Sequence, residues 1–415
     1  MRVITDFHLH SKWSRACSKD LTIPNIAAAC ERKGIQFVGT SDFTHPAWRK
    51  EIGLSLEDVG GAFAVKGATS ATRFLLSTEL SCIYKRDGKV RRVHHLVLLP
   101  TLAAVDALID SLNRRGCNLK ADGRPIIGID SEELLKLVLD ASSEGMLIPA
   151  HAWTPWFAVF GSQSGFDSLE ACFGEMTKYV PAIETGLSSD PKMNWRLKDL
   201  DHVFLVSNSD AHSLDKLGRE ANVFEMPLPS FAELRRILME KDKAKFIETI
   251  EFFPEEGKYH ADGHRACHFF CKPEETKKRK GICPVCGKPL TIGVLHRVDD
   301  LADRPEGEEP PLAVPYRSIV PLVDLIGSVL GVGPASKKVK KVYDALVADG
   351  RTEFGVLLDE PASELSRLVG AEVVDAVMAM RKGDMDIRPG YDGEYGEIKA
   401  HVPRTAKPKQ ASLVF

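Results

Sequence analysis

The first 250 residues alternate short apolar runs with amphipathic stretches, and this alternation restricts the possible folds more than any other feature. Residues 3–10 and 35–42 have the pattern of strands on either side of a helical stretch at 25–34. Similar apolar runs follow at 74–84, 90–100, 146–151, 181–186 and 202–213. Strands that alternate with helices are typical of parallel α/β folds, and about seven of them favour a barrel over an open sheet. No glycine-rich loop opens the first helix, which argues against a doubly wound nucleotide-binding fold.

The composition changes after this region. Residues 251–303 are polar and rich in Cys and His, whereas 304–315 are rich in Pro and Glu, as in a linker. Helical patterns resume at 316–400, and 401–415 form a tail. The sequence therefore predicts a barrel at 1–250, a zinc-binding module, a linker, a helical DNA-binding domain and a tail. A chain of 415 residues is long enough for two or three domains.

Two histidines stand one residue apart at the end of the first predicted strand. Side chains at i and i+2 point to the same face of a strand, so His8 and His10 should converge. Two interpretations are open: a hydrogen-bonded pair of histidines, or half of a metal site. Two ligands do not make a site, so the remaining ligands must come from other strands.

Polar residues of the ligand type follow most of the other predicted strands. In a parallel barrel the carboxyl ends of the strands meet at one rim, where these side chains would converge. Imidazole and carboxylate ligands together suit zinc, manganese or iron in a hydrolytic centre. Only one of His94 and His95 can share a given face of its strand. The candidates, in chain order, are Asp42, His45, Glu79, His94 or His95, His151, Asp210 and His212.

In this order, the motifs resemble the polymerase and histidinol phosphatase family of metal-dependent phosphoesterases over residues 1–225. The resemblance implies a distorted seven-stranded β/α barrel with two or three metal ions, Mg²⁺ or Mn²⁺, with Zn²⁺ as the alternative. Glu79 would bridge two metals, and Asp210 and Glu79 would be catalytic. One departure is the segment SRACS, where many members carry a further ligand, so Asp6 or Asp42 could serve as ligands or orient imidazoles. The implied ligands are His8, His10, His45, Glu79, His94, His151, Asp210 and His212.

The cysteines of the polar segment are spaced as in zinc-binding modules. Four of them form the pattern C-x3-C-x11-C-x2-C, and CPVCG has the form of a zinc knuckle. A segment without an apolar core of its own needs such a clip, so we expect a structural Zn²⁺ site. Three ligands are Cys267, Cys283 and Cys286, and the fourth is either Cys271 or His264.

The helical region contains LGVGPASKKVKK at residues 330–341. A glycine-containing turn that leads directly into a helix is the helix-hairpin-helix pattern, whose amides can hold a phosphate. Lys337, Lys338 and Lys340 follow within reach of a DNA backbone. The alternative is a solvated lysine-rich face on a packing helix.

The barrel motifs, the zinc module and the hairpin helices, in this order, are similar to the endonuclease Q family. The similarity implies an enzyme that incises double-stranded DNA 5′ of deaminated bases (uracil, hypoxanthine, xanthine) or abasic sites. An aromatic loop after His151 could stack a flipped base, or it could plug the barrel. Residues of this loop and of the GLSSD segment form the expected base pocket: Trp153, Trp156, Ser188 and Ser189.

Two other classes of function remain open: a small-molecule phosphatase or nucleotide phosphodiesterase on the same barrel, and a noncatalytic DNA-binding accessory protein. The net charge of −3 indicates that any nucleic-acid surface is local. The sequence has no signal peptide or membrane-spanning run, and its scattered cysteines do not suggest a secreted scaffold, so we expect a cytoplasmic protein. Gln410, Leu413 and Phe415 resemble the sliding-clamp-binding peptide of repair proteins, although a frayed tail is the alternative.

Overall fold

The computed structural model describes residues 1–401, which divide into two compact units. The first unit contains Met1–Ile319 and Arg388–Glu397, and the second contains Val320–Ile387 and the residues from Ile398 onward. Among residues 1–401, no helix combines the length and the apolar character required to cross a lipid bilayer.

The first unit is built on a distorted barrel, as predicted. Parallel pairing joins β1 to β2 and β2 to β5, whereas β6 pairs antiparallel with β5 and with β8. Strands β9 and β10 pair with each other, and the bridge between Leu9 and Ala211 returns the chain to the end of β1. The barrel strands are β1 (Arg2–Asp6), β2 (Phe37–Gly39), β5 (Arg73–Arg86), β6 (Lys89–Leu99), β8 (Met146–Pro149), β9 (Ala182–Glu184) and β10 (Phe204–Val206).

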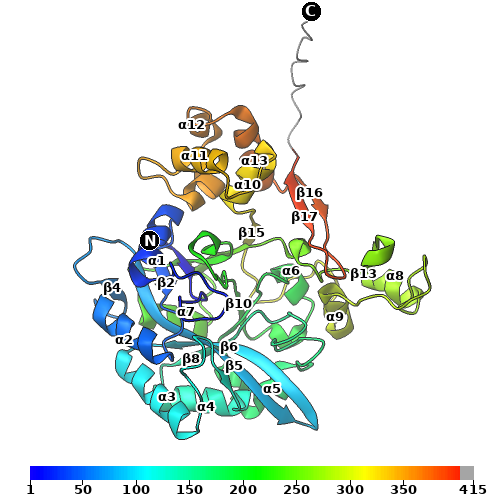
Figure 1. Ribbon diagram of the computed structural model, residues 1–415. Helices are drawn as coiled ribbons and strands as arrows, with labels where there is room; N and C mark the ends of the chain where they lie inside the picture. The colour runs from blue at the N-terminus through cyan, green and yellow to red at the C-terminus, as the bar shows by residue number, and fades with distance from the viewer. Residues whose placement is uncertain (402–415) are drawn as a thin grey trace, which may run out of the picture. The chain divides into compact units, whose positions relative to one another are not determined.

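The long hairpin formed by β5 and β6 departs from the expected parallel arrangement (Figure 1). Its two strands pair without interruption from Leu76 opposite Leu99 to Arg86 opposite Lys89. The turn is Asp87–Gly88, and both residues have positive φ, at 55° and 73°. An Asp-Gly pair favours this two-residue hairpin turn. Consequently Glu79 and His94 lie within strands, and not at strand ends.

Amphipathic helices cover the outside of the barrel. Helix α3 packs against α4 and against β6. Thr101 caps α3 by accepting a hydrogen bond from the Ala104 N–H, and Asp130 caps α4 through the Glu132 N–H, which fixes where each helix begins. The helices are α1 (Ile23–Lys33), α2 (Pro46–Ser55), α3 (Leu102–Arg114), α4 (Ser131–Ala141), α5 (Leu169–Phe173), α6 (Pro191–Asn194) and α7 (Phe231–Met239).

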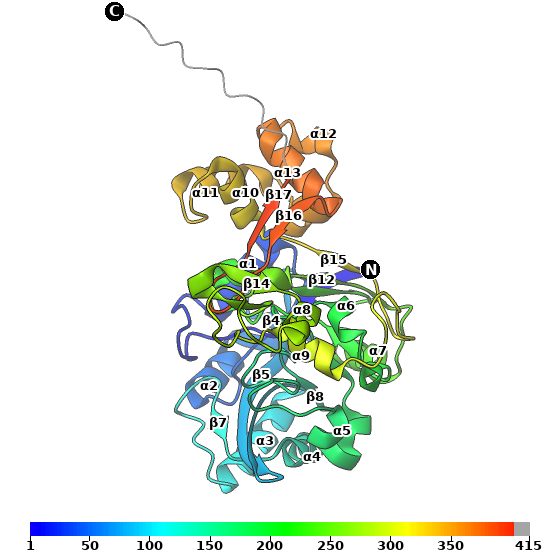
Figure 2. The ribbon, with the colours of Figure 1, turned by 90° about the vertical axis from the view of Figure 1, so that its right-hand side faces the viewer.

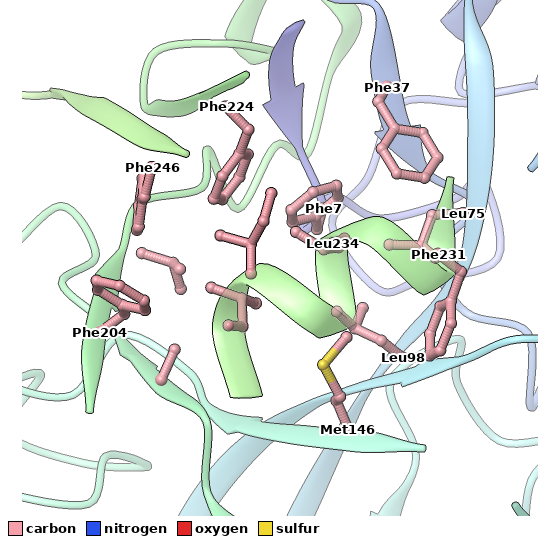
Figure 3. Packing of buried hydrophobic residues seen from close by; sticks show 14 of the residues in the cluster. Phe7, Phe37, Leu75, Leu98, Met146, Phe204, Phe224, Phe231, Leu234 and Phe246 are labelled. Atoms are coloured by element: carbon pink, nitrogen blue, oxygen red, sulfur yellow. The ribbon is translucent and has the colours of Figure 1, made fainter. Parts of the chain in front are cut away.

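Aromatic side chains from many strands meet around α7 in the main core (Figure 3). Strand β11 (Ala221–Glu225) pairs antiparallel with β1 and with β12 (Phe246–Glu251). The rings of Phe224 and Phe246 lie 4.4 Å apart, and the buried face of α7 completes the cluster. Burial of each such side chain stabilises the fold by about 1.5–3 kcal/mol, so this core gives the metal-ligand strands a rigid frame. Small additional strands are β3 (Leu56–Asp58), β4 (Phe63–Val65) and β7 (Ile126–Ile127).

The cysteine-rich module belongs to the first unit and contains a short hairpin followed by two helices (Figure 2). Its elements are β13 (Asp262–His264), β14 (Phe269–Cys271), α8 (Pro273–Lys278) and α9 (Val294–Leu301). Residues from both ends of the predicted helical domain also join this unit. Strand β15 (Tyr316–Ser318) pairs with β12, and the ring of Tyr391 packs 5.2 Å from that of Phe270. The unit boundary therefore differs from the predicted boundaries at 316 and 400.

The second unit contains two helix pairs, one of which is the expected hairpin. Helix α10 ends at Gly331, whose φ of 65° lies in the left-handed region that glycine adopts readily. Helix α11 begins after Ser336, whose hydroxyl accepts a hydrogen bond from the Val339 N–H. The elements are α10 (Leu322–Leu330), α11 (Lys337–Leu346), α12 (Ala362–Leu365), α13 (Ala371–Arg381), β16 (Met385–Arg388) and β17 (Glu397–Ala400).

Candidate functional site

The two N-terminal histidines lie just beyond the end of β1 and are completely buried. His10 Nε2 is 3.1 Å from Asp210 Oδ1 and 3.2 Å from Glu79 Oε2. His8 Nε2 is 3.4 Å from the same Glu79 oxygen. The two imidazoles therefore converge on one pair of carboxylates, as their i, i+2 spacing predicts.

Glu79 stands at the centre of the site. Its Oε1 atom is 2.6 Å from His94 Nδ1 and 3.1 Å from His151 Nε2. Its Oε2 atom faces His8 and His10 and accepts a hydrogen bond from Arg124 at 3.2 Å. Each carboxylate oxygen thus faces a different pair of histidines, because β5 and β6 bring Glu79 and His94 together from two antiparallel strands.

Two ligand groups share this glutamate. The first contains His8, His10, Glu79 and Asp210, and the second contains Glu79, His94 and His151. Within each group the ligand atoms lie within 4.8 Å of one another. His8 Nε2 is buried and has no hydrogen-bond partner in residues 1–401, although two carboxylates face it. An unpartnered imidazole nitrogen among carboxylates fits a site that holds divalent cations.

Buried acids behind the histidines fix their orientation. Asp42 lies 3.2 Å from His10 Nδ1 and accepts hydrogen bonds from Ser11 and Ser14. Glu184, at the end of β9, lies 3.0 Å from His8 Nδ1 and accepts a hydrogen bond from the His151 N–H. A carboxylate on the far ring nitrogen fixes the tautomer of a metal-binding imidazole. Asp42 therefore lies where a residue that orients His10 would stand, one of the roles that the sequence left open for it.

The backbone is strained at several of these positions. Asp42, His151 and Asp210 have φ values of 40°, 30° and 46°, in the left-handed region that side chains rarely adopt. A side-chain carbon at Gly186 would lie 2.5 Å from the Cβ of His151, so this position requires glycine. Strain of this kind costs on the order of 1–3 kcal/mol per residue and is concentrated at functional sites.

The charges in the site are strongly coupled. Burial lowers the pKa of His8, but the carboxylates of Glu184 and Glu79 outweigh burial and raise this pKa well above its ordinary value. Burial raises the pKa of Glu79. The positive charges of His94, His8 and Arg124 lower this pKa by more than burial raises it, so it lies well below the usual range. Burial lowers the pKa of His94 to about 4. A metal-binding imidazole must be neutral, so protons compete with cations for His8.

The remaining predicted ligands, His45 and His212, belong to neither group. The His45 ring stacks on Trp13 with a centroid distance of 4.7 Å, and His45 Nδ1 is buried without a hydrogen-bond partner in residues 1–401. The His212 ring lies 4.6 Å from the His10 ring. His95 faces the other way and lies 2.8 Å from the Ser131 hydroxyl, so the geometry favours His94 in the site.

Sequence reasoning missed two residues of this site. Glu184 was within reach of prediction, since it ends a strand in the run PAIETG. No sequence pattern pointed to Arg124, because it lies in an irregular segment between α3 and β7. It is the cation that pairs directly with Glu79, and a guanidinium next to the ligand groups suits a phosphate oxygen.

A separate ligand group lies in the cysteine-rich module. It consists of His264, Cys267, Cys283 and Cys286, with ligand atoms within 4.8 Å of one another. His264 Nδ1 is 3.5 Å from Cys286 Sγ. Cys271 is outside the group and lies 3.1 Å from the Thr276 hydroxyl. Of the two alternatives that the sequence left open for the fourth position, the structure places His264 in the group, because His264 ends β13 next to Cys286.

Only part of the expected base pocket is accessible. Trp153 and Ser189 are buried: the indole N–H donates to Asn194, and the Ser189 hydroxyl donates to the Thr185 carbonyl. Neither side chain can stack on or bind a flipped base in this structure, so both expectations are corrected. Trp156 is 50% exposed and Ser188 is partly exposed. These two remain candidates.

The expected phosphate-binding lysines lie at the start of α11. Lys337, Lys338 and Lys340 are all exposed, and Lys340 pairs with Asp344 at 2.8 Å. The expected clamp-binding residues Gln410, Leu413 and Phe415 lie outside the described residues.

Comparison with known proteins places this site in context. Residues 321–384 match the family model described as the MJ0043 C-terminal domain. Uncharacterized protein YqxK of Bacillus subtilis is 30% identical over 418 residues, which cover 96% of this chain and 99% of that protein. Uncharacterized protein MJ0043 of Methanocaldococcus jannaschii is 32% identical over 60% of this chain. The match spans 31% of the Methanocaldococcus protein.

Two solved structures are similar over nearly the whole chain. The crystal structure of the lesion-specific endonuclease PfuEndoQ from Pyrococcus furiosus has a TM-score of 0.86 and 32% identity and covers 100% of both chains. The structure of an Endonuclease Q complex with a 27-mer duplex carrying an abasic lesion at the active site has a TM-score of 0.84 and 32% identity. It covers 99% of this chain and 100% of the other.

Proposed function

The chain belongs to the endonuclease Q family, and on that premise we propose that it is a metal-dependent DNA repair endonuclease. It hydrolyses the phosphodiester bond 5′ of a deaminated base or an abasic site. The observation that carries this proposal is Glu79, whose two oxygens face two separate groups of metal-ligand residues. One shared carboxylate between two ligand groups is typical of two-metal phosphodiester hydrolysis.

Different residues would have different roles at this site. Glu79, Asp210 and the histidines of the two groups would hold Mg²⁺, Mn²⁺ or Zn²⁺, and His212, beside His10, could add a further ligand. Bound divalent cations lower the pKa of a water molecule and neutralise charge on the phosphodiester. Asp42 and Glu184 keep the imidazoles in the required tautomer. Arg124 is placed to hold a non-bridging phosphate oxygen.

The substrate range follows from the chemistry of deamination. Deamination of cytosine or adenine replaces an exocyclic amine by a carbonyl and turns the neighbouring ring nitrogen into a donor. One pocket with a donor and an acceptor can therefore accept uracil and hypoxanthine, and also xanthine, which has the same C6 carbonyl and N1–H. Cytosine and adenine would leave buried partners unpaired, at about 1–3 kcal/mol for each. Trp156 and Ser188 are the accessible candidates for this pocket.

The other two predicted elements would serve DNA binding. His264, Cys267, Cys283 and Cys286 would hold a structural Zn²⁺, since four protein ligands leave no position for substrate. The exposed lysines of α11 would contact backbone phosphates without reading sequence.

Incision of end-labelled duplexes tests the proposal. We expect a duplex with one deoxyuridine, deoxyinosine or abasic site to be cut once, immediately 5′ of the lesion, in a reaction that EDTA abolishes and a divalent cation restores. The products should carry a 3′-hydroxyl and a 5′-phosphate. Release of free uracil, or equal cutting of the matched deoxycytidine duplex, would contradict the proposal.

A further inference from the structure

A cavity of about 560 Å³ opens beside the barrel, separate from the two ligand groups. Its walls come from β6, from the loop at residues 161–167 and from Arg297 on α9. Ligand pockets commonly have volumes of about 300–1,000 Å³, so the cavity is large enough for part of a nucleotide. No step of the proposed hydrolysis uses it.

The lining of this cavity is strongly basic. Lys89, Arg91, Arg92 and Arg297 contribute four positive charges, and Asp167 contributes one negative charge. The chain as a whole carries a net charge of −3, so this concentration of cations is local. A concave surface lined by one sign of charge attracts the opposite sign, and here the complementary ligand is an anion.

Two of these arginines are fixed in place by the protein. The Arg91 guanidinium lies 4.1 Å from the centroid of the Phe166 ring and donates a hydrogen bond to the Gly165 carbonyl. Arg297 donates to the Phe160 carbonyl at 3.1 Å and to Asp167 at 2.5 Å. The walls of the cavity are therefore held in position before any ligand binds.

The other two cations have no partner within the described part of the chain. Within residues 1–401, the side chains of Lys89 and Arg92 form no hydrogen bond or ion pair. Arg91 Nε is also buried without a hydrogen-bond partner there. Lys89 is exposed and Arg92 is partly exposed, so both side chains can donate hydrogen bonds to an anion that has several acceptor oxygens.

The position of Arg92 relates this cavity to the proposed active site. Arg92 precedes His94 by two residues on β6, so both belong to the same face of the strand. Two residues of a strand span about 6.8 Å, so the cavity wall at Arg92 and the ligand His94 lie close together along β6. One DNA strand that crosses the ligand groups would therefore pass near Arg92.

We propose that the cavity binds a backbone phosphate of the DNA strand, close to the phosphodiester at the metal-ligand groups. Arg92 and Lys89 contact this phosphate, while Arg91 and Arg297 set the shape and charge of the site. The inference rests on the proposed nuclease function and adds a positioning site that holds the strand in register for incision. It predicts that substitution of Arg92 impairs incision of a DNA duplex more than it impairs hydrolysis of a small phosphodiester.

The test uses the full chain with the substitutions Arg92→Gln and Lys89→Gln, singly and together, on a duplex with one abasic site. For Arg92→Gln we expect an increase in KM of about 3- to 30-fold, with a smaller loss on bis(p-nitrophenyl) phosphate, which does not reach the cavity. The slope of log Kd against log salt should become shallower by about 0.9 for each lost phosphate contact. Arg92→Lys should restore most of this slope.

A matched control removes a charge elsewhere. Arg114→Gln alters an exposed arginine at the end of α3 whose side chain donates a hydrogen bond to Ser111, and its KM and salt slope should stay at wild-type values. Unchanged duplex KM and salt slope in the double variant would overturn the inference while leaving the nuclease function intact. Equal losses on the duplex and on the small diester would also overturn it. If the wild-type chain does not incise the duplex, the proposed function itself fails.

A free nucleotide is the competing ligand for such a cavity. Binding of a deoxynucleoside monophosphate to the wild-type chain, lost in Arg92→Gln while duplex KM is unchanged, would assign the cavity to a small anion and overturn the proposal.

Discussion

The protein contains two candidate metal sites that are assembled in opposite ways. The candidate ligands of the barrel site come from five separate segments between residues 8 and 210, and all are buried except Asp210, which is partly exposed. The four ligands of the zinc-type site lie between residues 264 and 286, in a module with a core cluster of only Cys271, Cys283 and Leu290, against which Cys267 and Phe269 pack. The barrel holds its candidate ligands in place through a large core, whereas we expect the small module to depend on a bound metal for its own fold.

This difference predicts different consequences of losing a ligand. At the barrel site the frame should survive and the chemistry should be lost. In the small module the local structure itself should be lost. The experiments below separate these outcomes, from the largest expected effect to the smallest.

Glu79→Gln should have the largest effect on activity. It removes the charge shared by the two ligand groups while keeping the size of the side chain. We expect incision to fall by at least about a thousandfold with bound metal also reduced, while duplex binding and thermal unfolding change little. Gel assays and metal analysis of the purified variant measure this, and incision close to the wild-type rate would remove Glu79 from the mechanism.

Cys283→Ser should unfold the small module. Loss of one thiolate should reduce zinc content by one ion per chain and expose the amides of β13 and β14 to hydrogen exchange. Cys271→Ser is the matched control, because Cys271 lies outside the ligand group, and it should retain the zinc. If Cys271→Ser loses the ion and His264→Ala keeps it, the assignment of the fourth ligand is reversed.

Asp42→Asn should have an intermediate effect at the barrel site. Asp42 touches His10 but belongs to neither ligand group. Removing an acid that orients a metal-binding imidazole commonly costs about 10- to 100-fold in metal affinity or activity. We expect a loss in this range that excess divalent cation partly restores, in contrast to Glu79→Gln. Full wild-type activity at limiting metal would exclude the orienting role.

Glu251→Gln should have the smallest effect, visible only as a pH dependence of stability. Burial raises the pKa of Glu251 to about 7, although Ser207 and Thr249 oppose this shift by donating hydrogen bonds to the carboxylate. The folded state therefore holds a proton that the unfolded chain releases near its ordinary value of 4.5. The stabilising contribution is fully present below about pH 4.5 and is lost as the pH rises towards 7.

The variant lacks this titration, so its free energy of unfolding should gain about 1–3 kcal/mol relative to wild type between pH 5 and pH 8. Urea unfolding at the two pH values measures the difference. Parallel pH profiles for the two chains would show that Glu251 does not carry a raised pKa.

The sequence by itself named the candidate ligands and their order along the chain, and the structure brings six of them together in two groups. The i, i+2 spacing of His8 and His10 was sufficient because it concerns neighbours on one strand. The cysteine spacing was sufficient for three of the four residues of the zinc-type group, Cys267, Cys283 and Cys286, but not for the fourth. The alternation of strands and helices also predicted the barrel. Apolar residues recur with one period in a strand and with another in a helix, so the sequence shows which type of element each segment forms.

Tertiary structure decided what depends on distant partners. The Asp87–Gly88 hairpin made β5 and β6 antiparallel and moved Glu79 and His94 from strand ends to the middle of the barrel wall. Long-range packing buried Trp153, brought His264 to the knuckle and placed Arg124 beside Glu79. Sequence periodicity shows which face of an element a side chain occupies. Which other element packs against that face depends on how the whole core is buried, and no local sequence pattern contains that information.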